Sequence, residues 1–386
     1  MTDKTPGSPI YLDHNATIPI DPEAVETMMP YLKGEFGNPS SGYPLGNRAK
    51  EGVEKARGET SALLGCQPGE IIFTSGGSES NNLGLKGLIN LADPGEFHII
   101  TSAIEHPAIL NPALFLMELG VKVTILPVDR LGQIDPDDVR KAITSRTTLI
   151  TLMLANNETG TLQSIREISQ IAKGHNVLFH TDAAQAVGKI KVDIDDLGVD
   201  FLSVAGHKLY GPKGVGVLYM RNGCSLTPLI HGAAQENGMR AGTENVILAA
   251  GLGAACRVAK ERLEEDFERN CLLRNRLQDL LFAGINGLVL NGHGEKRLPN
   301  TLNISVPGLE GGKILDGVPT IMASTGAACH DRTIKLSYVL SAMSVPPEVG
   351  MGALRLTLGR SNTMEQIEEA ARLIIGQVKG MRGESA

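Results

Sequence analysis

Short apolar runs rich in β-branched residues alternate with amphipathic segments along the first part of the chain. The runs cover residues 71–74, 97–101, 121–128, 147–154, 177–180, 201–204 and 215–220. Runs of this length that are apolar almost throughout are typical of strands buried on both faces of a mainly parallel sheet. Segments with a helical period, such as 135–143 and 164–173, lie between them. The alternation of strand and helix predicts an α/β fold.

The pattern changes after Thr243. Residues 246–281 have the spacing of one long amphipathic helix, whereas 302–306 and 354–358 alternate apolar and polar residues as half-exposed strands do. A helical pattern over 364–379 closes the chain. These elements predict a smaller α+β domain at the C-terminal end.

The composition supports a large folded core. Of the 386 residues, 42% are hydrophobic and 20% are charged, which excludes a disordered, collagen-like or coiled-coil chain. The formal net charge of −7 argues against a general binder of nucleic acids or anionic membranes. The first residues lack the apolar core of a signal peptide, and no apolar stretch approaches the ~20 residues that a membrane helix needs. We therefore expect a soluble, cytoplasmic protein.

The cysteines indicate neither a disulfide framework nor a zinc site. They are five in number, scattered, and without a Cys-x-x-Cys pair. Cys329 differs from the others because it follows the small-residue segment 324–328 and precedes His330. This setting makes it a candidate thiolate nucleophile. The remaining four have apolar or helical surroundings and are interpreted as packing residues: Cys66, Cys224, Cys256 and Cys271.

Two predicted strand ends carry residues suited to an aldehyde cofactor. Lys208 follows the run 201–204, and a desolvated lysine at a strand end can bond covalently to an aldehyde, although most lysines simply lie at the surface. Asp182 and Gln185 follow the run 177–180, at the edge where parallel sheets bind ligands. Pyridoxal phosphate needs a carboxylate that keeps its ring nitrogen protonated. An aspartate that caps the next helix is an equally good interpretation of Asp182 alone.

Further strand ends add an anion-binding turn, an imidazole and an amide. Gly77 and Ser78 lie in a glycine-rich turn that suits a phosphate, although it matches neither nucleotide-binding glycine motif and such turns are often merely structural. His106 follows the run 97–101, and an imidazole there can stack on a pyridine ring and exchange protons, although a lone histidine is more often structural. The segment 156–160 follows the next run, and an amide there, from Asn156 or Asn157, suits the phenolic oxygen of the cofactor.

Motifs in this order resemble those of the NifS-like cysteine desulfurases of the aminotransferase class V family, almost from end to end. They cover residues 11–17, 37–41, 74–82, 105–106, 156–160, 180–185, 206–213, 240–245 and 355–360. The resemblance implies the fold type I architecture of PLP-dependent transferases (aspartate aminotransferase-like), with a mainly parallel seven-stranded sheet in the large domain and a smaller α+β domain. The implied divisions are an N-terminal arm over 1–20 that joins the small domain, a PLP-binding domain over 21–255, and a small domain over 256–386 with the Cys329 loop.

Carried over residue by residue, the resemblance implies a site for pyridoxal 5'-phosphate and L-cysteine. The residues implied for the cofactor are Lys208 as the Schiff-base lysine, Asp182 at the ring nitrogen, His106 as the stacking and catalytic ring, Asn157 and Gln185 at the phenolic oxygen, and Gly77, Ser78 and His207 at the phosphate. Thr243 would reach the phosphate from the second subunit of a homodimer. Arg355, with Asn38, would bind the substrate carboxylate, and Cys329 would accept the sulfur as a persulfide and pass it to an acceptor protein. The resemblance implies no metal.

Three departures from the family pattern bear on function. Ala205 replaces the serine of most members, so one phosphate hydrogen bond should be missing. The loop 232–236 has fewer glycines than usual, and 325–330 is similar to the catalytic loop of selenocysteine lyases. Selenocysteine lyase is therefore a close alternative, and transamination is a related reaction that would not need Cys329. A non-catalytic sulfur-transfer scaffold is the alternative of another class, and a nicotinamide dehydrogenase is disfavoured by the missing Gly-x-Gly-x-x-Gly motif.

Overall fold

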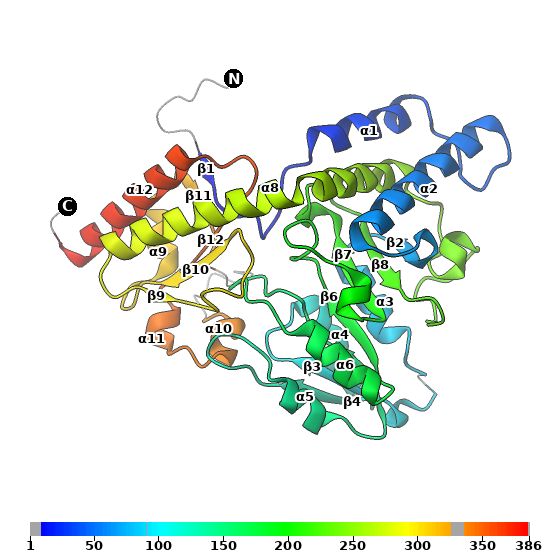
Figure 1. Cartoon of the computed structure of the whole chain (residues 1–386), viewed down its shortest axis with the longest axis horizontal. Coiled ribbons are helices and arrows are strands. Elements are labelled where there is room, and N and C mark those ends of the chain that lie inside the picture. Colours follow the sequence, from blue (N-terminus) through cyan, green and yellow to red (C-terminus); the bar gives the residue numbers. More distant parts are fainter. Residues whose placement is uncertain (1–8, 91, 326–335, 385–386) are drawn as a thin grey trace.

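A seven-stranded sheet forms the centre of the larger part of the molecule (Figure 1). The computed structural model describes residues 9–90, 92–325 and 336–384. Across the sheet the strands follow the order β2 (Ile71–Thr74), β8 (Gly216–Met220), β7 (Phe201–Ala205), β6 (Leu178–Asp182), β5 (Thr147–Thr151), β3 (His98–Ser102) and β4 (Lys122–Leu126). β8 runs antiparallel to both of its neighbours, and the other neighbouring strands are parallel. The predicted α/β fold with a mainly parallel sheet is confirmed.

Successive residues of the inner strands enter two different cores, as strands buried on both faces require. Ile99 of β3 packs in one core and Ile100 in the other. Helices α3 (Gly77–Lys86) and α4 (Pro107–Glu118) contribute to the first core. Among the helices that contribute to the second are α5 (Pro136–Ala142), α6 (Ile165–Gly174) and α7 (Ile194–Leu197). The expectation of full burial is wrong for β4, where Lys122 and Ile125 are exposed because the faces of this edge strand are only partly covered.

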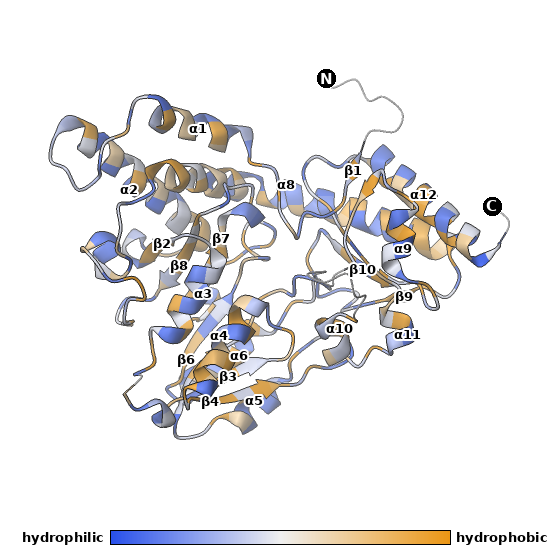
Figure 2. Cartoon of the chain, turned by 180° about the vertical axis from the view of Figure 1, so that it is seen from behind, coloured by the Kyte–Doolittle hydropathy of each residue, from blue (hydrophilic) through white to orange (hydrophobic). Residues whose placement is uncertain are grey.

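A smaller antiparallel sheet lies beside the first, in the order β12 (Ala353–Thr357), β10 (Thr301–Ser305) and β9 (Val289–Leu290). The amphipathic helix α12 (Met364–Arg382) packs its apolar side into the core of this part (Figure 2). Short elements complete it: α9 (Gly311–Asp316), α10 (Tyr338–Ala342), α11 (Pro347–Gly350) and β11 (Ile321–Met322).

The N-terminal arm lies in this smaller part. Its strand β1 (Ile10–Tyr11) pairs in parallel with β11, and the backbone oxygen of Leu12 accepts a hydrogen bond of 2.8 Å from Thr357 of β12. The long helix α8 (Val246–Gly284) is continuous across residue 255. Its first half packs in the large core and its second half in the small one, and the division of the chain at residues 20 and 255 stays a prediction.

Small residues let α8 approach α2 (Pro44–Leu64) closely. A Cβ atom added to Gly253 of α8 would lie 2.5 Å from Cα of Ala56 in α2, a distance that real Cβ atoms do not show. Helix α1 (Pro22–Lys33) contacts the same stretch of α8, since a Cβ on Gly251 would lie 2.6 Å from Sδ of Met28. Because Gly251 and Gly253 have no side chain, α1 and α2 can pack directly against α8.

We expect Gly253→Ala to lower the free energy of unfolding by about 1–3 kcal/mol, because its methyl group would meet backbone that cannot move aside. The matched control is Gly376→Ala in α12, where no atom lies within 4 Å of the added Cβ. That variant should be neutral or stabilised by up to about 1 kcal/mol, since glycine is a poor helix former. Denaturant unfolding followed by circular dichroism measures both, and equal stabilities would contradict the close α2–α8 contact.

Candidate active site

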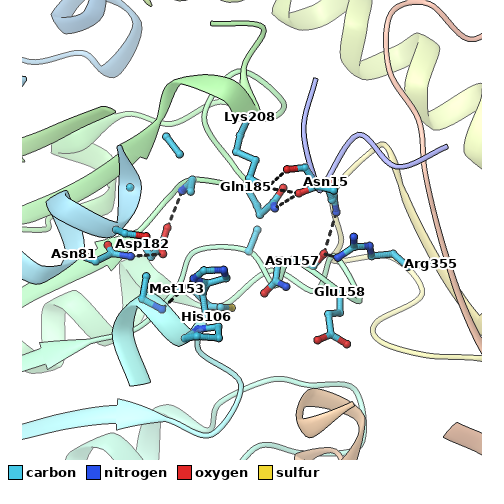
Figure 3. A pocket seen from close by; sticks show the side chains of 18 of the residues that line it. Asn15, Asn81, His106, Met153, Asn157, Glu158, Asp182, Gln185, Lys208 and Arg355 are labelled. Atoms are coloured by element: carbon cyan, nitrogen blue, oxygen red, sulfur yellow. Dashed lines mark hydrogen bonds between the residues drawn. The ribbon is translucent and has the colours of Figure 1, made fainter. Parts of the chain in front are cut away.

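One cavity of about 600 Å³ lies at the carboxyl edge of the large sheet, between that sheet and the smaller one (Figure 3). Nine of the residues implied by the motifs line it: Gly77, Ser78, His106, Asn157, Asp182, Gln185, His207, Lys208 and Arg355. They come together because the carboxyl ends of neighbouring parallel strands open at the same edge. Arg355 comes from the opposite side, on β12 of the smaller sheet.

Lys208 follows β7 in the short turn Gly206–Lys208. Its Nζ donates hydrogen bonds of 2.5 and 2.7 Å to the backbone oxygens of Asn15 and Ala16 in the N-terminal arm. Burial and the nearby charge of Arg355 lower the pKa of this amine to about 8, against the weaker effect of two carboxylates. A substantial fraction of the amine is therefore uncharged near neutral pH, and this is the form that attacks a carbonyl group.

Asp182 ends β6 and is almost fully buried. Its Oδ2 accepts a hydrogen bond of 2.7 Å from the Asn81 amide of α3, and its Oδ1 accepts one of 2.9 Å from the backbone N–H of Ala184. One oxygen thus supports the following turn, while the carboxylate as a whole faces the cavity. The interpretation of Asp182 as a helix cap is wrong, because the next helix begins only at α7 (Ile194–Leu197). Asn81 had no role in the sequence interpretation, although it lies within the glycine-rich motif.

His106 precedes α4 as its N-cap, and its Nδ1 accepts a hydrogen bond of 3.1 Å from the backbone N–H of Ala108. Burial is the largest cause of a lowered pKa for this imidazole, with Asp182 opposing it and Lys208 adding to it. A neutral ring whose Nδ1 is an acceptor carries its proton on Nε2. The ring therefore offers the cavity a flat face and one N–H group.

His207 lines the cavity beside Lys208, and its Nδ1 lies 3.3 Å from Oγ1 of Thr17. Burial and then the charge of Lys208 lower its pKa to about 4. The imidazole is therefore neutral at physiological pH. It can act toward an anion as a hydrogen-bond donor, but not as a positive charge.

Two buried glutamates support the segments that carry His106 and Asn157. Glu105 accepts hydrogen bonds from the Ser102 hydroxyl at 2.7 Å and the Met153 backbone at 3.0 Å, and burial raises its pKa to about 8. Glu158 accepts a bond of 2.5 Å from the hydroxyl of Ser337, and burial raises its pKa to about 7. The sequence interpretation missed both as supports, because nothing in the motifs reveals which acids become buried.

Arg355 enters the cavity from β12. Its Nη2 pairs with Oδ1 of Asp13 at 2.8 Å, and its Nη1 donates to the backbone oxygen of Asn157 at 3.3 Å. Two polar atoms here are buried without a hydrogen-bond partner among the described residues: Nε of Arg355 and Oδ1 of Asn157. Because buried polar atoms are normally paired, these atoms indicate that this end of the cavity is shaped for a polar ligand.

Comparison with known proteins places the chain in a family. Residues 10–370 match the model for "Aminotransferase class-V". The chain belongs to the aminotransferase class V family. It is 47% identical over 363 residues to the cysteine desulfurase IscS of Dictyoglomus turgidum, covering 93% of this chain and 91% of that one. It is 44% identical over 383 residues to the cysteine desulfurase IscS of Methanosarcina thermophila, covering 99% and 95%.

Solved structures of class V relatives share the fold. A NifS-like protein superimposes with a TM-score of 0.90 at 35% identity, over 96% of this chain and all of the other. SspA, solved in complex with cysteine, superimposes with a TM-score of 0.81 at 35% identity, over 92% of this chain and 99% of the other. The resemblance stated from the motifs is thereby confirmed at the level of the family and the fold.

Two residues implied by the class V resemblance do not join the cavity in this structure, and the position of a third is not among the described residues. Asn38 is exposed between α1 and α2, where its side chain accepts from the backbone of Ser40. Thr243 is exposed at a separate pocket. Cys329 lies outside the described residues, although Ser324 and Leu336, on either side of residues 326–335, both line the cavity.

The four cysteines within the described residues lie elsewhere. Burial raises the pKa of each thiol, to about 12 for Cys66 and Cys256, so they remain protonated at neutral pH. None of the four lines the cavity. Within the same described residues, no helix combines the length and the apolar composition that a membrane span requires.

The cavity predicts an unusual titration for Lys208. In protein freed of any aldehyde bound to this lysine, we expect its reaction with an amine-selective reagent to rise with pH to a plateau with a midpoint near 8, since only the uncharged amine reacts and an ordinary lysine titrates at about 10.4. In Arg355→Gln the midpoint should move to higher pH, because removal of the neighbouring cation favours the charged ammonium. Peptide mapping by mass spectrometry measures the modified fraction. A midpoint for Lys208 equal to that of exposed lysines would refute the low pKa.

Proposed function

We propose that this protein is a cysteine desulfurase that uses pyridoxal 5'-phosphate, converts L-cysteine to L-alanine and transfers the sulfur to Cys329. Curated relatives named cysteine desulfurase are 39–47% identical to it over nearly its whole length. The observation that carries the proposal is the cavity in which Lys208, Asp182 and His106 face Arg355. A lysine, a buried acid and a flat ring suit the cofactor, while the arginine suits an amino-acid carboxylate.

The ring of the cofactor fits the side of the cavity formed by β5 and β6. Asp182, with both oxygens held by N–H donors, is a fixed acceptor for a protonated ring nitrogen. The neutral ring of His106 offers a stacking face, and Asn157 and Gln185 offer amides to a phenolic oxygen. When bound, the cofactor would supply an electron sink for the negative charge that develops on the substrate.

The phosphate fits the start of α3. The first backbone N–H groups of a helix lack partners within it and carry a partial positive charge, so they bind anions. Gly77 begins this helix, and a Cβ added there would lie 3.2 Å from the Cβ of Ala205. The wall is therefore tight and apolar at Ala205, so Gly77, Ser78 and His207 would hold the phosphate without the hydroxyl that most relatives have at this position.

The remaining residues would handle the substrate. Arg355, with Asn38, would bind the carboxylate of L-cysteine, and the uncharged amine of Lys208 would take the proton from Cα and return one later. The thiolate of Cys329 would attack the substrate sulfur, so that the bond from Cβ to Sγ breaks as the new sulfur–sulfur bond forms. Protonation of the former Cβ gives alanine and leaves Cys329 as a persulfide. The terminal sulfur would then pass to an acceptor protein for iron–sulfur cluster assembly or another thio-modification, in the cytoplasm.

A substitution at the sulfur acceptor separates cofactor binding from sulfur transfer. We expect Cys329→Ser to bind the cofactor and turn yellow as the wild type does, but to lose at least about 100-fold in sulfide release from L-cysteine, because a hydroxyl is a far weaker nucleophile than a thiolate. Lys208→Ala should lose the covalently held cofactor altogether. Absorption spectra, alanine and sulfide assays with a thiol reductant, and selenocysteine as a second substrate are the measurements.

The outcomes distinguish the candidate functions. If Cys329→Ser released sulfide from L-cysteine at the wild-type rate, the residue that accepts the sulfur would be another one. Activity confined to selenocysteine would favour the lyase that the sequence of residues 325–330 suggests. A wild-type protein that neither binds the cofactor nor releases sulfide would leave only the non-catalytic scaffold.

We further propose a two-fold homodimer in which Thr243 completes the partner's phosphate site. Thr243 and Asn38 are exposed in the single chain, and so are the apolar side chains of Phe36 (80%) and Leu32 (58%) near Asn38. Exposed large apolar side chains of this kind often mark an interface, and a two-fold contact would complete both sites equally.

Mixed dimers test this assignment. We expect Thr243→Val and Lys208→Ala homodimers both to have impaired activity. If Thr243 serves the partner's site, a mixed dimer concentrates both defects in one site and leaves the other intact, so the purified mixed dimer should have about half of the wild-type activity. If Thr243 serves its own subunit, each site carries one defect and activity is not restored. Sedimentation measures the oligomeric state, and a fully active monomer would contradict the dimer.

A further inference from the structure

Lys189 is a buried lysine with no role in the proposed chemistry. Only 7% of it is exposed. Its Nζ donates to two amide oxygens, Oε1 of Gln185 at 2.7 Å and Oδ1 of Asn15 at 3.1 Å. Burial, followed by the charges of Lys208 and Arg355, lowers its pKa well below the ordinary value. The two amide oxygens thus each accept one N–H group of this amine.

Two hydrogen bonds of the Gln185 side chain determine which of its ends is the oxygen and which is the nitrogen. Its oxygen accepts from Lys189, and its Nε2 donates to the backbone oxygen of Asn15 at 3.0 Å. A backbone carbonyl cannot donate, so both ends of the amide favour the same orientation. The N–H₂ end of Gln185 is thus held on the side of Asn15 and Lys208, as Figure 3 shows.

The same lysine orients the side chain of Asn15. Because Oδ1 of Asn15 accepts from Lys189 and from Asn300 at 3.1 Å, its Nδ2 is the end that donates to the backbone oxygen of Asn157 at 3.2 Å and to Thr301 at 2.9 Å. The backbone oxygen of Asn15 is the acceptor for Nζ of Lys208. Lys189 therefore bonds directly to Asn15, the residue that connects Lys208 on one side of the cavity with Asn157 on the other.

Burying an amine has a cost that an apolar side chain of the same length would avoid. A methionine at this position would fill similar volume, but it would leave Oε1 of Gln185 without its donor, while Oδ1 of Asn15 would keep its bond from Asn300. The N–H groups of the lysine therefore favour the orientation in which the oxygen of the Gln185 amide faces Lys189.

We propose that Lys189 is a positioning residue that holds the Gln185 amide with its N–H₂ group toward the phenolic oxygen of the cofactor. A reversed amide would place its oxygen against that oxygen, which is repulsive. This inference rests on the proposed function for the identity of the cofactor.

The test uses the full-length protein and pyridoxal 5'-phosphate itself. We expect Lys189→Met to raise the dissociation constant of the cofactor about tenfold, since a buried hydrogen bond loses its partner, and to shift the absorption maximum of the bound cofactor. Lys191→Met is the matched control, because Lys191 is exposed two residues away and its loss should change neither quantity.

A double-mutant cycle separates positioning from general damage. If Lys189 acts through Gln185, then Lys189→Met should have little further effect on affinity and spectrum in a Gln185→Leu background. Additive losses, or wild-type affinity and spectrum in Lys189→Met, would overturn the proposal. If circular dichroism shows Lys189→Met to be unfolded, Lys189→Gln replaces it in the same cycle, with a loss of about threefold expected because one amide can donate where two bonds were made. The proposed function fails instead if the wild-type protein does not bind the cofactor through Lys208.

Discussion

Asn15 is the residue on which the two sides of the cavity depend. It belongs to the N-terminal arm, yet it is 1% exposed and lies between the two sheets. Its backbone oxygen accepts from Lys208 and Gln185, and its side chain bonds to residues of both parts. Because buried polar groups need partners, each of these side chains is restrained by the others. The site is therefore held by a segment that contributes no chemistry of its own.

The position of this arm also explains why the smaller sheet can take part in the site. Strand β1 pairs with β11, and Thr357 of β12 bonds to the backbone on both sides of Asp13. Asp13 in turn pairs with Arg355 at 2.8 Å. The arm thus ties the arginine of one sheet to the lysine of the other, and a change in how β1 docks would move both.

The large sheet and most of the cavity could be predicted from the sequence, because both follow from local patterns. Buried strands are recognisable from their apolar runs. The residues that follow parallel strands lie at one edge of the sheet, and this places Asp182 and Lys208 near each other. The supports could not be predicted in this way. Asn81 bonds to Asp182 across 101 residues of sequence, and Lys189 bonds to Asn15 across 174. Such pairings depend on the packed structure, and nothing in a local pattern distinguishes a buried lysine from an exposed one.

The exposed positions of Asn38 and Thr243 have a different cause. Neither residue follows a strand of the sheet, so the sheet does not place either of them at the edge where the cavity lies. Their roles came only from the resemblance, which describes an assembly, whereas a single chain presents just its own half of any shared surface.

Burial acts differently on the cavity's acids, imidazoles and cations, and this difference gives the site its charge. It lowers the pKa values of His106 and His207 and raises that of Glu105, so these groups are uncharged near neutral pH. The N-terminus of α3 and the guanidinium of Arg355 present positive potential at two places in the cavity, and Asp13 offsets part of it beside Arg355. A phosphate and a carboxylate would balance that potential at two separate places, which orients the bound groups before any bond changes.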